Sequence, residues 1–373
     1  MNVRRLTALC WLVVSLMIAT GWEIATAAQE NPVIKAAHYR WQQRADGKAI
    51  WLGFDATDQD LKLLQKEADV VFLHLGGGGP NDMHSAITDA GLQYITGWTA
   101  LKELQASGMP ITDAGLAHLS GLPKLEKLML FDTKVTDAGL AHLAGMTQLR
   151  ELWLDGLPLT DAGMVHLKDL TRLRVLRFFN APITDAGLAN LKGMTEIEDL
   201  QLGYTLITDA GMPIIAGMKK LQTLDLRTKI TDAGLAHVVG LHELRWLCLN
   251  ETSVTDAGIV HLSGLTKLEW LMLEGTQVTD AGIAKLTNLS QLNTLYLSKT
   301  HIGDGAMASI AQFPRLARLN LNETEVTDEG LAKLGALRSL KSLEAYHTKA
   351  TPQGFARLAE QLPEAEINKY NKY

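Results

Sequence analysis

Cysteine is nearly absent from this chain of 373 residues, which has only Cys10 and Cys248. Cys10 lies in an apolar stretch that we expect to be removed, so the mature chain would hold one thiol and no internal disulfide. Packing alone must then hold the fold together. Cys248 and His242 lie in different parts of one repeat, and no third group orients them, so we expect no thiol catalyst there.

Charged and aromatic residues are also scarce, at 20% and 6% of the chain, while hydrophobic residues make up 47%. This composition is globular, and the formal net charge of -6 disfavours a nucleic-acid partner because phosphate backbones would be repelled. The run from Gly76 to Gly79 lacks the Lys-Ser/Thr of a phosphate-binding loop and is interpreted as a flexible insertion. We therefore expect no cofactor, no metal and no catalytic residue.

Only one long apolar run occurs, from Leu6 to about Thr20. Arg4 and Arg5 precede it and small residues at 25–28 follow it, which is the pattern of a secretory signal peptide. The run is short for a membrane span, which needs about 20 residues. We expect residues 1–27 to be cleaved, with an uncleaved anchor as the alternative. The protein would then be exported, to the periplasm, the cell surface or the medium, with a charge of 33 - 40 = -7.

The tetrapeptide Thr-Asp-Ala-Gly recurs along the chain. It begins at Thr88, Thr112, Thr136, Thr160, Thr184, Thr208, Thr231, Thr255 and Thr279, with degenerate copies at Gly303, Thr327 and Thr351. Each step is 24 residues except the one of 23 from Thr208 to Thr231. A weaker copy at Thr57 lies 31 residues before Thr88, which implies an insertion of seven. A fixed short period indicates a repeat solenoid and not several compact domains.

Two periodicities alternate within the unit from Thr136 to Leu159. Leucines and a methionine recur every three residues after Thr136, as on a short helix, and Leu152 and Leu154 recur every two, as on a strand. Threonine is a good helix N-cap, and aspartate suits the first helical turn. Pro213 falls five residues after Thr208, inside the expected helix of the 23-residue unit. We therefore expect an irregularity near residues 208–230.

A single unit cannot fold by itself. About eight buried side chains at roughly 2 kcal/mol each do not offset about 1.5 kcal/mol for each of 24 ordered residues. Stacked units share one parallel sheet, and because helices are wider than strands the sheet lies on the concave side with the helices on the convex side. We predict an N-terminal cap at 28–48, an α/β solenoid of 12 to 13 units at 49–362, and a C-terminal cap and tail at 363–373 with a closing strand near Pro363–Ile367.

The strand half of the unit resembles the leucine-rich repeat, with the pattern L-x-x-L-x-L-x-x-T-x-V at Leu268, Leu271, Leu273, Thr276 and Val278. In that family the side chain at the Thr276 position bonds to backbone, and Met109, Leu157 and Ala181 replace it in early units, so we expect a weaker ladder there. The helix half, I-T-D-A-G-L-A-x-L, is similar to bacterial GALA-type repeats and to repeats of F-box proteins. The resemblance implies a leucine-rich-repeat horseshoe and leaves the ligand open.

Residues that flank the strand leucines should face the concave side. The middle row reads Gln105, Met129, Trp153, Arg177, Gln201, Asp225, Cys248, Met272, Tyr296, Asn320 and Glu344. Aromatic residues gather in two groups there, which predicts ligand-binding hot spots, although rings that stack only to stabilise the sheet are the alternative. The predicted ligand-binding residues are Phe131, Trp153, Arg177 and Phe179 in one group and Trp246, Trp270, Met272 and Tyr296 in the other.

Two rows of potential metal ligands have simpler explanations. His118, His142, His166, His237 and His261 share one helix position, as repetition of a consensus requires. The aspartates of Thr-Asp-Ala-Gly suit helix starts. We therefore predict a non-catalytic module that binds a protein or peptide on its concave surface. The alternatives are an envelope glycan-binding protein, since aromatic faces also stack on sugars, and a passive structural scaffold.

Overall fold

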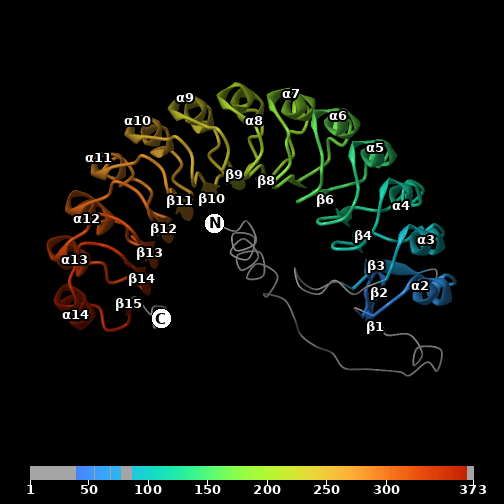
Figure 1. Cartoon of the computed structure of the whole chain (residues 1–373), viewed down its shortest axis with the longest axis horizontal. Coiled ribbons are helices and arrows are strands. Elements are labelled where there is room, and N and C mark those ends of the chain that lie inside the picture. Colours follow the sequence, from blue (N-terminus) through green and yellow to red (C-terminus); the bar gives the residue numbers. More distant parts are fainter. Residues whose placement is uncertain (1–38, 54, 68, 77–85, 368–373) are drawn as a thin grey trace. The chain divides into compact units, whose positions relative to one another are not determined.

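The computed structural model describes residues 39–53, 55–67, 69–76 and 86–367. The predicted signal peptide, most of the insertion after His74 and the last residues of the tail lie outside this part of the chain. Within residues 39–367, short helices lie on the outer side of a curved stack and one sheet of 15 strands lies on the inner side (Figure 1). None of the described helices has the length and apolarity that crossing a membrane requires.

The strands follow one another in chain order across the sheet. They are β1 Tyr39–Arg44, β2 Gly47–Leu52, β3 Val70–His74, β4 Glu103–Gln105, β5 Lys127–Met129, β6 Glu151–Trp153, β7 Val175–Arg177, β8 Asp199–Gln201, β9 Thr223–Asp225, β10 Trp246–Cys248, β11 Trp270–Met272, β12 Thr294–Tyr296, β13 Arg318–Asn320, β14 Ser342–Glu344 and β15 Glu366–Ile367. The pairs from β2 to β15 are parallel, as predicted, and β15 is the expected closing strand. β1 differs, because it turns back on β2 as an antiparallel hairpin and covers the first edge of the sheet.

A helix precedes each strand from β3 onwards. The α-helices are α2 Asp58–Leu64, α3 Asp89–Leu92, α4 Asp113–Ala117, α5 Asp137–Leu140, α6 Asp161–Met164, α7 Asp185–Leu188, α8 Met212–Ile215, α9 Asp232–Leu235, α10 Asp256–Ile259, α11 Asp280–Ile283, α12 Asp304–Ile310, α13 Asp328–Leu334 and α14 Pro352–Gln361. Turns of 3₁₀ helix extend several of them, at Gln93–Ile95, Ala141–Leu143, Val165–Leu167, Ala189–Leu191, Ala236–Val238 and Val260–Leu262.

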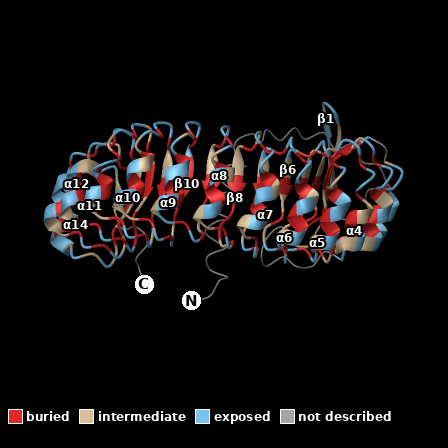
Figure 2. Ribbon diagram, turned by 90° about the horizontal axis from the view of Figure 1, so that it is seen from above, coloured by how far each residue is buried: buried red, intermediate tan, exposed pale blue. Residues whose placement is uncertain are grey.

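The core is a continuous spine of leucine between sheet and helices. The central strand leucines, such as Leu152, Leu176 and Leu200, are fully buried, and so are the first helix leucines, such as Leu140 and Leu188. Figure 2 shows this buried layer running along the described repeats, with exposed residues on the outer helices and in the loops. Each unit is therefore covered on both flat faces by its neighbours, as the stacking argument requires.

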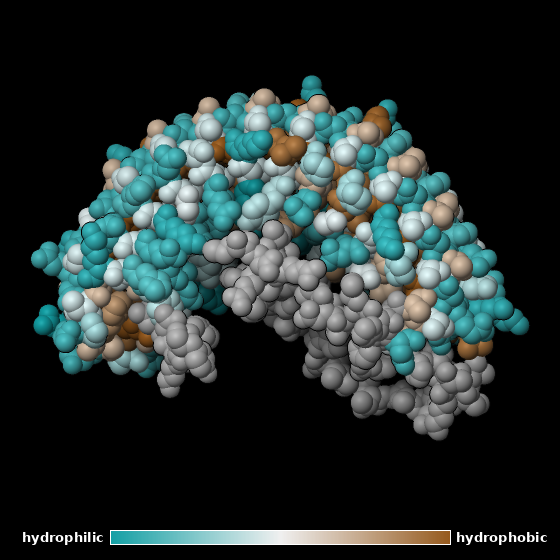
Figure 3. Space-filling view, viewed as in Figure 1, coloured by the Kyte–Doolittle hydropathy of each residue, from teal (hydrophilic) through white to brown (hydrophobic). Residues whose placement is uncertain are grey.

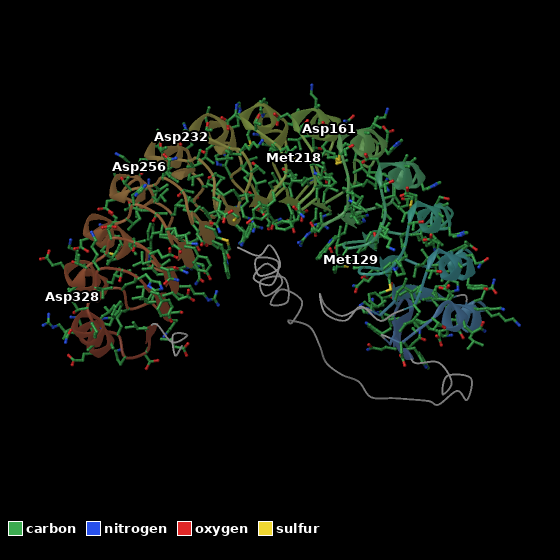
Figure 4. The ribbon with its side chains drawn as sticks, viewed as in Figure 1. Met129, Asp161, Met218, Asp232, Asp256 and Asp328 are labelled. Atoms are coloured by element: carbon green, nitrogen blue, oxygen red, sulfur yellow. The ribbon has the colours of Figure 1, made fainter. Side chains whose placement is uncertain are left out.

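The Thr-Asp-Ala-Gly motif also joins each unit to the next. The Asp256 carboxylate accepts one hydrogen bond from the Thr279 backbone N–H (2.8 Å) and another from its hydroxyl (2.5 Å). The Thr279 oxygen in turn accepts from the Ala281 N–H and caps α11. The same bonds to the following unit recur at Asp58, Asp89, Asp113, Asp137, Asp161, Asp185, Asp209, Asp232, Asp304 and Asp328, several of which Figure 4 labels.

The glycine of the motif makes room for this carboxylate. A Cβ on Gly282 would lie 2.3 Å from Asp256 Oδ1, and the glycines of the neighbouring units give similar distances. The sequence alone predicts only that the aspartates stabilise the helix starts. Their second partner, one repeat further along, explains why threonine, aspartate and glycine recur together.

The turns after β4 to β14, except the one after β9, each use a residue with positive φ. These residues are Gly108, Asp132, Gly156, Asn180, Tyr204, Glu251, Gly275, Lys299, Glu323 and His347. In the 23-residue unit this position is missing, and Thr228 directly follows Arg227. The shortening is thus in the turn after β9 and not in the helix. Pro213 is tolerated, because a 3₁₀ turn at Asp209–Gly211 comes first and Pro213 falls in the first turn of α8.

The threonine that follows this turn forms the predicted ladder. Its hydroxyl donates to the carbonyl of the residue three positions earlier, as in Thr276 to Leu273 (2.7 Å). The bond recurs at Thr133, Thr205, Thr252, Thr300, Thr324 and Thr348. In early units the apolar Met109, Leu157 and Ala181 are buried at this position instead, so the ladder is interrupted there as predicted.

Candidate binding surface on the inner sheet face

The parallel register places the predicted rows side by side. Trp153 pairs with Arg177, Trp246 pairs with Trp270, and Met272 pairs with Tyr296. Because the strand leucines face the helices, the residues on either side of each leucine point to the inner face of the sheet. The row assignment made from the repeat is thus correct.

Several of these side chains are more buried than a solvent-facing row suggests. Trp246 and Met272 are each 7% exposed, Cys248 is 1% exposed and Asp225 is fully buried. Strands about 4.8 Å apart bring neighbouring side chains into contact, so large residues cover one another. The other predicted residues are half-buried: Phe131, Trp153, Arg177, Phe179, Trp270 and Tyr296.

Arg177 on β7 is held by an aromatic ring and a carboxylate. Its guanidinium carbon lies 4.3 Å from the centre of the Trp153 ring, and its Nε donates to Asp155 at 2.9 Å. The other Asp155 oxygen accepts from the backbone N–H of Phe179 at 2.9 Å. Burial raises the pKa of the Asp155 carboxyl, and the Arg177 charge opposes that shift. Trp153 and Arg177, two predicted site residues, therefore form one unit with an aspartate that the prediction lacked.

Arg227 repeats this arrangement two strands further along. Its guanidinium carbon lies 4.9 Å from the Phe179 ring centre and 5.1 Å from that of Tyr204, and these two rings meet edge to face at 5.1 Å. Its Nε lies 3.0 Å from one oxygen of the fully buried Asp225. Removing either charge of this buried pair would destabilise the fold, because the remaining charge would be buried without a partner.

Gly203 lies at the middle of this contact. A Cβ there would lie 2.7 Å from an Asp225 oxygen and 3.0 Å from two atoms of the Phe179 ring. Any side chain would push the ring and the carboxylate apart. Beside it, Tyr204 occupies the turn position with φ of 60°, a conformation that tyrosine rarely adopts. At this position the tyrosine ring makes a stabilising contact with Arg227.

Asp199 on β8 completes this part of the surface. One of its oxygens accepts from the side-chain amide of Gln201 at 2.6 Å. Burial is the main cause that raises the pKa of Asp199 from 3.8 to about 6, with the Arg177 charge acting against it. We call the whole group the central cluster; it comprises Trp153, Asp155, Arg177, Phe179, Asp199, Gln201, Gly203, Tyr204, Asp225 and Arg227.

The second predicted group forms a separate, mostly apolar cluster. Trp246, Cys248 and Met272 pack together as a buried set, with Trp270 and Tyr296 against them. Arg318 on β13 lies 5.2 Å from the centre of the Trp270 ring. The indole N–H of Trp246 is buried and has no acceptor in the described part of the chain. We call these five residues the apolar cluster. Phe131 belongs to neither cluster and is half-buried after β5.

Sequence reasoning missed the carboxylates of the central cluster, and one signal for them was present. That signal is the position of Asp199 and Asp225 in the assigned rows, near Arg177 and Arg227, because charged side chains that become buried are normally paired. Within the described residues no group of three or more histidine, cysteine, aspartate or glutamate side chains is placed to hold a metal ion. The side of the repeat stack seen in Figure 3 is mainly hydrophilic, with scattered apolar residues.

Comparisons with known proteins concern the fold. No family model matches the chain, and no curated protein does. Among solved structures, an internalin of Listeria monocytogenes matches with a TM-score of 0.59 and 25% identity over 79% of this chain and 86% of its own. A leucine-rich-repeat protein of Leptospira interrogans matches with a TM-score of 0.58 and 18% identity, over 82% of this chain and 86% of its own.

A structure described as a TDR receptor matches with a TM-score of 0.52 at 14% identity, over 83% of this chain and 56% of its own. The plant peptide hormone receptor RGFR1, solved in complex with RGF2, matches with a TM-score of 0.50 at 14% identity, over 82% of this chain and 59% of its own. These matches agree with the parallel sheet, the short helices and the repeat described above. The chain is a leucine-rich-repeat solenoid, and bacterial leucine-rich-repeat proteins are among the structures that it resembles.

Proposed function

We propose that this protein is a non-catalytic binding module that takes a protein or peptide partner on its inner sheet face. The observation that carries the proposal is the central cluster, where half-buried aromatic rings and arginines are fixed in place before any partner arrives. Tryptophan, tyrosine and arginine dominate binding energy at protein interfaces. Side chains already held by neighbours lose little conformational freedom on binding.

Two further observations support this assignment. The apolar cluster lies on the same face and offers Trp270 and Tyr296 as half-buried rings. The plant peptide hormone receptor RGFR1, whose fold this chain resembles, was solved in complex with RGF2. We also propose that the chain is exported through its first 27 residues. The sequence of the mature N-terminus would test that proposal. The GALA type of the repeat remains a prediction.

The test uses peptides selected on the purified chain from a displayed random library. Calorimetry then compares their affinity for the wild type, Trp153→Ala, Trp270→Ala and the control Val260→Ala. Val260 lies in the outer layer and is 39% exposed. We expect each tryptophan variant to weaken binding by about tenfold or more, because a hot-spot truncation costs about 2 kcal/mol or more. The control should bind like the wild type.

Thermal melting of the same variants separates binding from folding. We expect the tryptophan variants to melt close to the wild-type temperature. If both melt several degrees lower and still bind the peptides, the rings only stabilise the sheet and the proposal is wrong. If the library yields no binder while a glycan array does, the glycan-binding alternative replaces it. A chain with no ligand of either kind would be a passive scaffold.

A further inference from the structure

The central cluster already binds two guanidinium groups, both supplied by this chain. Arg177 has the Trp153 ring on one side and Asp155 as its anion. Arg227 lies against two rings and has Asp225 as its anion. Flat aromatic faces combined with carboxylates are what a guanidinium group needs, since the ring stacks on the plane while the carboxylate accepts from its edge.

Asp199 is the carboxylate of this cluster that has no cation of its own. Its hydrogen-bond partner is the neutral amide of Gln201, and in the described part of the chain no lysine or arginine nitrogen lies within 4.0 Å of it. It is half-buried, so a partner can reach it from the inner face. A carboxylate that is largely withdrawn from water gains more from a bound cation than an exposed one does.

The charge of the inner face favours the same kind of partner. From β4 to β14 its three rows carry four cationic side chains, Lys127, Arg177, Arg227 and Arg318. They carry seven carboxylates, Glu103, Glu151, Asp155, Asp199, Asp225, Glu274 and Glu344, so the balance is 4 - 7 = -3. Complementary charge speeds encounter and rejects partners of the wrong sign. An acidic segment would be repelled from this surface and a basic one attracted.

An unsatisfied donor lies in the same cluster. The indole N–H of Trp153 is buried and has no acceptor in the described residues. A donor without a partner costs free energy that a bound acceptor would recover. A peptide backbone carbonyl would serve as such an acceptor once the Trp153 ring turns this buried N–H toward the inner face. This second feature is independent of the carboxylates.

We propose that the central cluster binds an arginine or lysine side chain of the protein or peptide partner, with Asp199 as its anion. This inference rests on the proposed function, and it names the chemical class of residue that the partner must present. A partner that binds only through apolar side chains, on the apolar cluster, is the contrary case.

The experiment compares arginine with its neutral isostere. Two hexapeptide libraries are synthesised with capped ends and random residues around one fixed position, which is arginine in the first and citrulline in the second. The purified chain captures peptides from an equal mixture, and mass spectrometry gives the ratio retained. We expect arginine peptides to be enriched by about tenfold, which corresponds to about 1.4 kcal/mol, because citrulline offers Asp199 no charged donor.

Two variants distinguish the site from the general charge of the surface. Asp199→Asn keeps the shape and the contact with Gln201 but removes the negative charge. Glu344→Gln removes one charge from the same face, on β14, where the carboxylate also has an amide partner, Asn320 at 2.9 Å. We expect Asp199→Asn to abolish the preference for arginine and Glu344→Gln to retain it.

Each result bears on the proposal in a different way. Equal retention of arginine and citrulline peptides by the wild type would overturn the cation site and leave the binding function standing. An equal loss of preference in both variants would show a diffuse charge effect and would overturn the site as well. No retention of any peptide would overturn the proposed function and this inference together.

Discussion

Asp199 shows what a single residue contributes to this surface. Its pKa is raised to about 6, chiefly because the carboxyl is withdrawn from water. The charged groups around it are Arg177 on β7, Asp155 after β6 and Asp225 on β9. The two aspartates oppose ionisation of Asp199, and the arginine favours it. At neutral pH the carboxyl is ionised in spite of this cost.

The free-energy cost of ionising the buried Asp199 carboxyl predicts a pH-dependent effect of Asp199→Asn on stability. The folded-state pKa of about 6 exceeds the ordinary value of 3.8, so the favourable contribution is complete below about 4 and is lost as the pH rises through 6. We expect the variant to gain stability over the wild type across that interval, on the order of 1 kcal/mol or more above pH 7. Urea denaturation at pH 4, 6 and 8 measures it, and a constant difference would contradict the assignment.

For single residues, the sequence predicted which face of the sheet a side chain occupies better than how deeply that side chain is buried. The repeat assigned Trp153, Arg177 and Phe179 to one face, because a strand alternates its side chains whatever their type. It did not predict that Trp246 and Met272 would be buried, since burial depends on which neighbours stand on the adjacent strands. The pairing of Arg227 with Asp225 could have been inferred, because residues two apart along a strand share a face.

At the scale of the helix and its start, the Thr-Asp-Ala-Gly motif performs three tasks. Threonine caps its own helix, aspartate receives the threonine of the next unit, and glycine leaves space for the preceding aspartate. The outer layer is therefore linked along the stack by side-chain bonds, while the inner layer is linked by the sheet. These bonds cross between units, so a mutation in one unit acts on its neighbour.

A double-mutant cycle at Asp256 and Gly282 tests this linkage. Asp256→Ala should lower the free energy of unfolding by about 1–3 kcal/mol, because two donors of Thr279 lose their acceptor. Gly282→Ala should destabilise the wild type by bringing a methyl group to 2.3 Å from Asp256 Oδ1, and it should cost clearly less in the Asp256→Ala background. Chemical denaturation gives all four values. Strictly additive costs would mean that the two residues do not share a contact.

Element types were predictable here and several boundaries were not. Each unit has the same spacing of apolar residues, which predicts one short helix and one short strand. Because the spacing recurs in every unit, each unit supports the same assignment. Pro213 was expected to disturb its helix, but the chain accommodates it by placing a 3₁₀ turn first. The antiparallel β1 lies before the first repeat, where periodicity carries no information.

At the scale of the whole repeat stack, fold and proposed function have one cause. Units that cannot fold alone are stabilised by a shared core of leucine side chains. Stacking on this core aligns their inner-face residues in continuous rows. The central cluster spans β6 to β9 and the apolar cluster spans β10 to β12, so the two adjoin along the sheet. A partner lying along the rows would meet a charged, ring-lined site and then an apolar one.

Hydroxyl-radical footprinting of the chain with and without a selected peptide tests the central claim most directly, because it reports the solvent exposure of individual side chains. Saturation with peptide should reduce oxidation of Trp153, Phe179 and Trp270 on the inner face. Oxidation of Phe355, which is half-buried in the outer helix α14, should stay unchanged. Protection of outer-helix residues, with the three inner rings oxidised as before, would contradict the account.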